Sequence, residues 1–353
     1  MLSRHTRGAE RSFVRQAVLT QPGRIEMREV PAPKPRPGEA LLRIRRIGIC
    51  GSDIHVWRGK HPFTSYPVVQ GHEYSATVEA VGPGVTGVRP GMKATARPQL
   101  VCGQCPPCRR GQYNVCNALK VQGFQAPGCA QDLFVVPLSR LVPLPDGMSF
   151  DNGALVEPVA VAARATGRAG DLRGLNVVVL GAGTIGNLVA QAARCRGAGN
   201  VFITDVNPFR VGIAAACGID HVCNIREEKL EDFANRLFGG GGFDVAFEAA
   251  GSEEALDDAL RNVRKSGRVV AVGVFEQKPR VDISLLGDRE LTLTGTLMYK
   301  HADYEQAVKW IAHGDIVTEP LITRHFPFEQ YAAAYSFIEE QAHQALKVMV
   351  DVG

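Results

Sequence analysis

Four cysteines lie close together in the chain, separated by two, two and seven residues: Cys102, Cys105, Cys108 and Cys116. Four thiolates can surround one tetrahedral zinc ion at about 2.3 Å each, and a closed shell of four sulfurs is a structural site. Intervening glycines and prolines allow the tight turns that bring the sulfurs together. The alternative is disulfides, which are typical of small secreted chains and not of a 353-residue chain in which we expect no secretory leader. The sequence therefore predicts a structural zinc at this quartet.

Composition narrows the class of protein. Hydrophobic residues make up 45% and charged residues 22%, which is ordinary for a soluble globular enzyme of two domains. No apolar run reaches the roughly 18 residues that span a bilayer, so we expect no membrane partner. Of the net charge of +4, residues 1–15 carry +3. The nearly neutral remainder gives no electrostatic case for binding nucleic acid.

The Arg-rich residues 1–15 have two interpretations. Few acidic residues and several hydroxyl side chains would suit an organellar transit peptide, whereas Glu10 and the short length favour a flexible terminus before the first strand. We expect the second, and a cytoplasmic protein. The cysteines not assigned to metal are then buried free thiols in a reducing compartment: Cys129, Cys195, Cys217 and Cys223.

The pattern of apolar residues changes twice along the chain. From about Gln16 to Leu155, short apolar runs alternate with Gly/Pro turns, which predicts a β-rich domain. From Asn176 onward, strands alternate with helices of roughly ten to fifteen residues, which predicts a parallel sheet covered on both faces. Residues from about 300 to 353 contain two helices and a final strand, 347–351, that we expect to rejoin the first domain. The predicted fold class is α/β.

A glycine-rich sequence, Gly181-Ala-Gly-Thr-Ile-Gly186, follows one predicted strand and opens a helix, which is the context of a dinucleotide-binding fingerprint. Gly181 permits the tight turn, Gly183 lets a pyrophosphate approach the backbone, and Gly186 lets the helix pack closely. Amides at the helix start, at Thr184 and Ile185, would bind the anionic pyrophosphate. The alternative, glycines that merely serve a turn, does not account for this context.

Asp205 lies nineteen residues after Gly186, at the end of the next predicted strand. A carboxylate there accepts hydrogen bonds from ribose hydroxyls and repels a 2′-phosphate, which favours NAD over NADP. Arg210 argues the other way, because a nearby arginine can bind that phosphate. With Asp205 present, we expect Arg210 to contact the ribose or solvent.

Three more segments carry metal-ligand side chains outside the quartet: Cys50, the pair His72-Glu73, and Glu157. Cysteine, histidine and carboxylate are ligands of catalytic zinc, which keeps one position open for water or substrate. Individually they have structural interpretations, as a core thiol, a buried hydrogen-bonded ring and a helix cap. Beside the quartet and the glycine fingerprint, they predict a catalytic zinc site.

These motifs occur in the order of a known family, and the chain resembles the zinc-dependent medium-chain alcohol dehydrogenases, in the polyol (sorbitol) and butanediol branch. The resemblance extends from Arg15 to Val352. It implies a GroES-like catalytic domain over 16–160, rejoined by 300–353, and a Rossmann NAD-binding domain over 161–299, with a flexible leader over 1–15. Relatives pair through the edge of the Rossmann sheet, so it also implies a homo-oligomer, a tetramer or dimer.

The resemblance also assigns roles to single residues. Cys50 and His72 would ligate the catalytic zinc, and the acidic ligand stays open between Glu73 and Glu157, which can bind directly or through water. Asp53 would accept from the His72 ring and fix its tautomer.

Two residues of the same motif match the proton-relay positions. Ser52 would take the proton of a zinc-activated secondary alcohol and pass it through the cofactor ribose and His55 to solvent, while the hydride moves to NAD+.

The substrate is less defined by the sequence. The resemblance implies a pocket lined by Trp57, His61, Phe63 and Phe124. Sorbitol-type enzymes carry an Arg-Tyr pair where this chain has Met298-Tyr299, and the Trp-Asp-x-x-Trp signature of threonine dehydrogenases is missing from the sequence. Sugar alcohols, sugar acids and short vicinal diols all stay open.

We therefore expect an NAD- and zinc-dependent oxidoreductase that converts a secondary alcohol into a ketone. Two alternatives are a zinc-stabilised binding module and an inactive structural relative. The first usually needs paired CxxC units farther apart or a basic surface. The second conflicts with the filled catalytic positions. About two zinc ions per chain would indicate the enzyme, and one would indicate the module.

Overall fold

The computed structural model describes residues 12–353, so residues 1–11 of the predicted leader lie outside the described part. Strand β1 (Phe13–Gln21) pairs antiparallel with β2 (Arg24–Pro31). Arg15 in β1 forms ion pairs with Asp132 and Glu329 and donates to the Val352 carbonyl at 2.9 Å. The leader expected over 1–15 therefore extends no further than Ser12.

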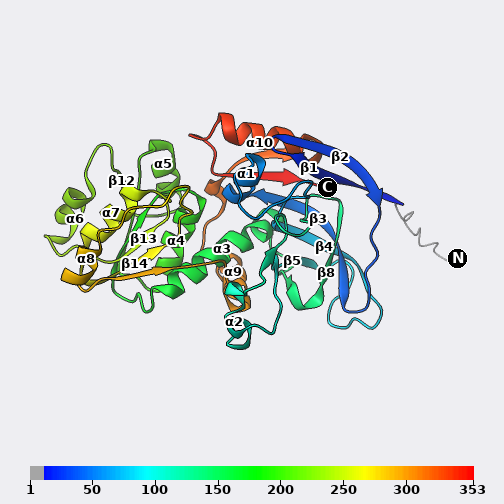
Figure 1. Ribbon diagram of the computed structural model, residues 1–353, viewed down its shortest axis with the longest axis horizontal. Helices are drawn as coiled ribbons and strands as arrows, with labels where there is room; N and C mark the ends of the chain where they lie inside the picture. The colour runs from blue at the N-terminus through cyan, green and yellow to red at the C-terminus, as the bar shows by residue number, and fades with distance from the viewer. Residues whose placement is uncertain (1–11) are drawn as a thin grey trace.

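The first lobe is built on a seven-stranded sheet (Figure 1). Its strands in spatial order are β16 (Ile322–Pro327), β17 (Lys347–Asp351), β3 (Glu39–Ile49), β4 (Glu73–Val81), β5 (Lys93–Ala96) and β9 (Leu141–Pro143), and β8 (Leu133–Pro137) also pairs with β3. Helices α1 (Gly51–Trp57) and α10 (Tyr331–Glu340) belong to this lobe. Strand β17 pairs antiparallel with β3, so the end of the chain rejoins the first domain.

The second lobe holds a six-stranded parallel sheet. Its strands in spatial order are β12 (His221–Asn224), β11 (Asn200–Asp205), β10 (Asn176–Leu180), β13 (Phe243–Glu248), β14 (Val263–Ala271) and β15 (Thr292–Gly295). The helices between them are α4 (Thr184–Cys195), α5 (Pro208–Ala216), α6 (Leu230–Phe238), α7 (Glu253–Asn262) and α8 (Ile283–Asp288). This strand order, 3-2-1-4-5-6 in chain order, is that of doubly wound sheets that bind dinucleotides at the point where the order reverses. The predicted α/β class is confirmed.

Helix α3 (Phe150–Arg168) runs from the first lobe to the second and packs against α4 and α9 (His301–His313) (Figure 1). The domain boundary expected at residue 160 falls inside this helix. Pro158 lies within α3 and does not end it. The helix is largely buried, and the packing of its apolar side chains outweighs the hydrogen bond that a proline removes.

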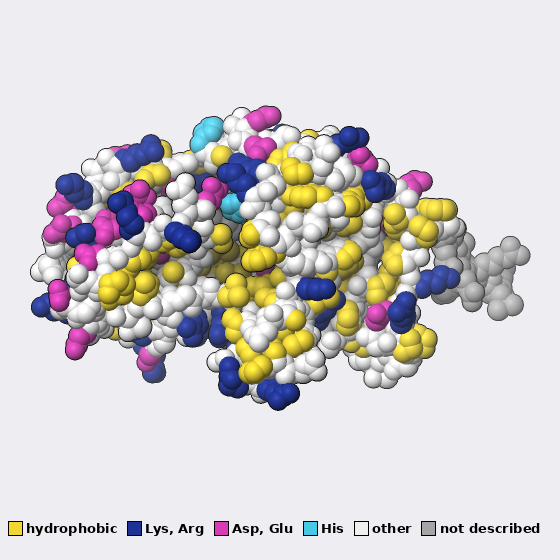
Figure 2. All heavy atoms as spheres, viewed as in Figure 1, with side chains coloured by type: hydrophobic (Ala, Val, Ile, Leu, Met, Phe, Trp, Pro, Cys, Tyr) yellow, Lys and Arg dark blue, Asp and Glu magenta, His cyan; other side chains and the backbone are white. Residues whose placement is uncertain are grey.

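The quartet lies in a small lobe that projects from the first domain beside α9 (Figure 1). Strands β6 (Gln99–Leu100) and β7 (Lys120–Val121) pair at its base, and it contains helix α2 (Pro106–Arg109) and the 3-10 turn η1 (Tyr113–Val115). We call residues 99–121 the cysteine lobe. The surface is hollowed where the two large lobes meet (Figure 2). Within residues 12–353, no helix is long and apolar enough to cross a membrane.

Candidate active site

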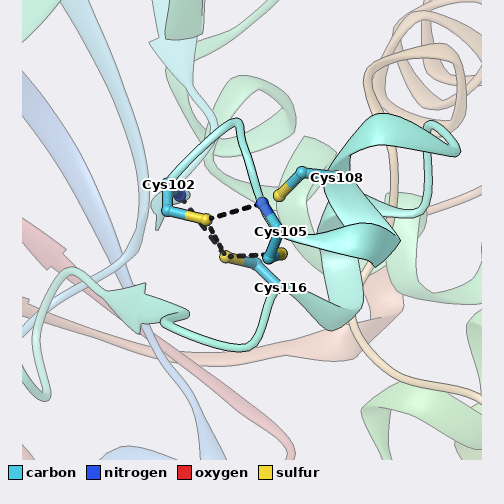
Figure 3. A group of neighbouring side chains, drawn as sticks. All are labelled: Cys102, Cys105, Cys108 and Cys116. Carbon is cyan, nitrogen blue, oxygen red and sulfur yellow. Dashed lines mark hydrogen bonds between the residues drawn. The ribbon is translucent and has the colours of Figure 1, made fainter.

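The four sulfurs of the quartet converge, as Figure 3 shows, and all lie within 4.8 Å of one another. The Cys116 sulfur is 3.8 Å from that of Cys105 and 3.5 Å from that of Cys102. A tetrahedron with bonds of about 2.3 Å has edges of about 3.8 Å, so the arrangement fits one zinc ion. The backbone N–H groups of Asn117 and Cys108 lower the pKa of the Cys105 thiol to about 6, which favours the thiolate that binds metal.

A second group of ligand atoms comes from the ends of β3 and β4. Cys50 follows β3 and caps α1, His72 immediately precedes β4, and Glu73 is the first residue of β4. Gly48 of β3 is paired with Glu73, so the antiparallel register brings these ends together. The Cys50 sulfur, a His72 ring nitrogen and a Glu73 carboxylate oxygen lie within 4.8 Å of one another. These are the residue types and the size of a catalytic zinc site.

The orientation of His72 is set by a carboxylate behind it. The ring is 4% exposed, and its Nδ1 lies 3.4 Å from Oδ1 of Asp53. Burial opposes a charge on this ring, but Asp53 outweighs it and raises the pKa of His72 well above its usual value. The backbone N–H of Cys50 donates to the other oxygen of Asp53 at 2.9 Å. Asp53 is therefore placed to hold the Nδ1 proton, which leaves Nε2 for a metal.

Lys347 of β17 is a charged residue of this site that the sequence did not reveal. Its ammonium group donates to the Glu73 carboxylate and to the Ile49 carbonyl at 3.0 Å, and it is 3% exposed. A Cβ at Gly48 would come within 2.4 Å of the same carboxylate. The available signal was a lysine directly before the apolar run Val348–Val350 of the final strand.

Of the two carboxylates left open as the acidic ligand, Glu157 is not part of the group formed by Cys50, His72 and Glu73. It lies inside α3 instead of capping a helix, and the Tyr299 hydroxyl donates to its carboxylate. Burial raises the pKa of Glu157 to about 7, and nearby Glu73 acts in the same direction. In this structure Glu73 is thus the acidic member of the cluster, with Glu157 beside it.

The two residues expected to relay protons lie on α1. The Ser52 hydroxyl donates to the Cys50 sulfur at 3.1 Å. His55 lies one turn further along, with its Nδ1 3.8 Å from an oxygen of Glu276. Among the hydrogen bonds of residues 12–353, none joins Ser52 directly to His55.

Aromatic side chains wall the site on one side. The Phe124 ring lies 4.9 Å from that of His72 and stacks on His61 at 4.8 Å, and the Thr64 hydroxyl is 2.7 Å from Nδ1 of His61. Burial lowers the pKa of His61. Trp57 does not line this wall, because its ring packs against Tyr335 in the core and its Nε1 donates to Glu339. Phe63, the fourth expected residue, is 73% exposed.

The glycine-rich turn joins β10 to α4. Gly181 has φ +104°, and a Cβ at Gly186 would meet the Gly181 carbonyl oxygen at 1.8 Å, whereas a Cβ at Gly183 would meet nothing within 4 Å. The helix begins at Thr184, so its first amides, including that of Ile185, have no partner within the helix. Space beside Gly183 and free amides together fit a pyrophosphate.

Asp205 ends β11, next to this turn. The Ala182 amide donates to its Oδ2 at 2.7 Å. Arg210 lies with Nη1 4.0 Å from the same oxygen and donates to the Ala342 carbonyl at 3.3 Å. The guanidinium thus has a carboxylate and a carbonyl of this chain as neighbours, and its Nε has no hydrogen-bond partner within the described residues.

Comparisons with known proteins agree with this geometry. Residues 36–146 match the alcohol dehydrogenase GroES-like domain, and residues 184–313 match the zinc-binding dehydrogenase domain. The chain is 30% identical over 345 residues to sorbitol dehydrogenase of Bacillus subtilis, covering 96% of this chain and 97% of the relative.

Two further comparisons add a second substrate type and a solved structure. The chain is 34% identical over 318 residues to 2-dehydro-3-deoxy-L-galactonate 5-dehydrogenase of Pseudoalteromonas atlantica, covering 90% and 92%. A solved Escherichia coli alcohol dehydrogenase in complex with NADH superposes with a TM-score of 0.90 at 29% identity, covering 97% of this chain and 100% of the other.

Proposed function

We propose that Cys50, His72 and Glu73 form the reaction centre of this chain, because it belongs to the zinc-dependent medium-chain alcohol dehydrogenases. These enzymes transfer a hydride from a secondary alcohol to a nicotinamide cofactor. One observation carries this proposal: the sulfur, nitrogen and oxygen atoms of Cys50, His72 and Glu73 lie within 4.8 Å of one another. Three protein ligands of these types leave the fourth position of a tetrahedral zinc open.

The two proposed zinc ions would have separate binding residues. The cysteine quartet would hold a structural zinc, and Cys50, His72 and Glu73 a catalytic one, with Glu157 as a neighbour that is held by Tyr299. When bound, zinc lowers the pKa of a coordinated alcohol and NAD+ accepts the hydride.

The chain's own side chains then orient groups and move the proton. Asp53 fixes the His72 ring, and Lys347 fixes one oxygen of Glu73. The Ser52 hydroxyl, 3.1 Å from the Cys50 sulfur, receives the alcohol proton. His55, whose side chain is 26% exposed, would then pass a proton toward solvent by way of the cofactor ribose, since no hydrogen bond of the described residues joins it directly to Ser52.

NAD is the proposed cofactor. The Gly181–Gly186 turn would receive the pyrophosphate, with the amides of Thr184 and Ile185 as donors. Asp205 would accept from the adenosine ribose, and it repels a 2′-phosphate. Arg210 lies against this carboxylate, which leaves it less able to bind such a phosphate.

The proposed substrates are polyols and sugar acids. Both classes occur among the relatives, as sorbitol and a deoxy-galactonate. The wall of Phe124 and His61 offers an apolar ring face and an imidazole to a substrate of alternating CH and OH groups.

We also propose a homo-oligomer, a dimer or tetramer that pairs through β15, one of the two edge strands of the parallel sheet. We propose the cytoplasm as its location, since the nine cysteines, all within the described residues, are free thiols.

We propose to divide the chain into a catalytic domain of residues 16–160 and 300–353 and an NAD-binding domain of residues 161–299.

The test measures metal content and NADH formation on one preparation. We expect about two zinc ions per chain and NADH production with members of a panel of polyols, vicinal diols and sugar acids, and much less with NADP+. Ser52→Ala should lower kcat by roughly 100-fold or more while zinc content stays at two. The exposed Ser139→Ala is the matched control.

Two outcomes would contradict parts of this function. A panel without any turnover would reject the dehydrogenase assignment. A fully active Ser52→Ala variant would reject the relay alone.

A further inference from the structure

The cysteine lobe touches a distant segment of the chain through side chains that are not metal ligands. Gln99 in β6 donates to the Tyr299 carbonyl at 2.7 Å, and Asn114 in η1 donates to the Leu297 carbonyl at 3.0 Å. The hydroxyl of Tyr113, also in η1, accepts from the His301 amide. The lobe therefore grips the backbone of residues 297–301 at three points, which we call the clamp.

The gripping side chains are buried. Gln99 and Asn114 are each 3% exposed, and each donates its bond from the amide nitrogen, while the side-chain oxygen has no hydrogen-bond partner within the described residues. A buried amide that loses its acceptor is costly, so neither side chain can be released without loss of free energy. The contact between the lobe and the segment is thus a fixed part of the fold.

The segment itself has an unusual backbone. Met298 has φ +46°, in the left-handed region, and its side chain packs on the core of the second lobe. A non-glycine residue in this region is strained and persists only where its surroundings hold it. The clamp holds the carbonyls on either side of Met298, at Leu297 and Tyr299, and so holds this conformation.

The held conformation aims Tyr299 at the reaction centre. Its side chain is fully buried, its ring meets Tyr304 edge-on at 4.9 Å, and its hydroxyl donates to Glu157. Glu157 lies beside the Cys50, His72 and Glu73 cluster. A continuous series of contacts therefore runs from η1, between two cysteines of the quartet, to a carboxylate at the reaction centre.

We propose that the cysteine lobe is a positioning device for the Tyr299–Glu157 pair, acting through the clamp on residues 297–301. The proposal rests on the proposed function for the role of Glu157. The closed metal shell stiffens η1, η1 sets the backbone of the segment, and the segment sets where the Tyr299 hydroxyl meets Glu157. Asn114, Gln99 and Tyr113 are positioning residues in this scheme.

A double-mutant cycle tests the path on the metal-loaded full chain. Asn114→Ala should lower kcat/KM by about 5- to 20-fold, as expected for one buried hydrogen bond, and keep two zinc ions per chain. Tyr299→Phe removes the final hydroxyl and should cost at least as much. Because both act on the same pair, the double variant should lie within about twofold of Tyr299→Phe.

A second measurement does not depend on activity. In hydrogen exchange, the peptide that covers 297–301 should exchange roughly tenfold faster in Asn114→Ala than in the unaltered protein. The matched control is Arg110→Ala, an exposed residue of the same lobe; it should stay within about twofold in both assays. Asn114→Asp, which removes the donor and keeps the shape, replaces Asn114→Ala if the latter fails to fold.

The outcomes separate the proposals. A double variant whose loss equals the product of the single losses overturns the clamp as a positioning device, and so does unchanged exchange at 297–301. If no alcohol is oxidised by any preparation, the proposed function fails, while the exchange comparison still decides whether the lobe holds the segment.

Discussion

Glu157 has the pKa shift with the most direct consequence for stability. The side chain is 5% exposed, and burial raises its pKa from 4.5 to about 7. Between these two values the folded chain holds a proton that the unfolded chain has released. Stability therefore falls as pH rises through this window, because folding binds a proton that becomes scarcer.

This predicts a pH dependence for the metal-free protein. Between pH 5 and 8, its free energy of unfolding should fall by about 2.5 kcal/mol more than that of Glu157→Gln, which cannot titrate there. Urea unfolding of both chains at each pH measures the difference. Parallel curves for the two proteins would show that Glu157 is ionised throughout.

In the turn between β10 and α4, two glycines are needed for different reasons, one for the fold and one for ligand binding. Gly186 is required by the fold, because a Cβ there would overlap the Gly181 carbonyl oxygen. Gly183 has φ −66° and open space around its Cα, so the fold alone would accept alanine. The space at Gly183 is useful only to a ligand.

The two glycines should therefore respond differently to the same substitution. Gly186→Ala should lower the free energy of unfolding by about 2 kcal/mol, as overpacking does. Gly183→Ala should stay within about 0.5 kcal/mol of the unaltered chain and yet bind NADH at least roughly tenfold more weakly. Urea unfolding and NADH fluorescence titration measure the two effects. NADH binding to Gly183→Ala at unaltered affinity would place the pyrophosphate elsewhere.

Some secondary-structure elements could be predicted from the sequence alone, and others could not. The strand expected over 347–351 matches β17 in the structure, because an apolar run of this length is typical of a buried strand. Strand β16 was not predicted: its residues are half-exposed and gain their partner only from β17. The length of α3 was not predictable either, because packing of α3 overrides Pro158.

The residues of the site also fall into two groups, those that short sequence motifs predict and those that only the tertiary fold brings together. Cys50, His72 and Glu73 could be grouped from short motifs, and the β3–β4 register brings them together. Lys347 and the Tyr299–Glu157 contact join segments more than a hundred residues apart. Only the tertiary fold determines such contacts, so no local pattern could have revealed them.

At the scale of the whole molecule, the main feature is the cleft between the two large lobes. A charged contact spans this cleft. Glu276, which follows β14 in the second lobe, lies 3.8 Å from His55 and 3.5 Å from Lys60 in the first. The side chains of Glu276 and Lys60 are about half exposed, so the attraction is weak and salt-sensitive.

This contact should help the lobes close over the cofactor. Glu276→Gln should raise the KM for NAD+ roughly two- to threefold at about 0.02 M ionic strength, and the difference should vanish at about 0.5 M. Steady-state kinetics at the two salt concentrations measure it, with the exposed Lys278→Ala as control. An effect that persists at high salt would mean that Glu276 acts by direct contact with the cofactor.

Strand β17 fits beside β3 although 298 residues separate Ile49 from Lys347. At about 5–20 residues per second, a ribosome needs roughly 15 to 60 s to make that stretch. During this time the second half of β3 has one unpaired edge, and Glu73 lacks its lysine. Because an open strand edge is a template for other chains, the newly made protein is most prone to aggregate, and most in need of a chaperone, while its second lobe is being synthesised.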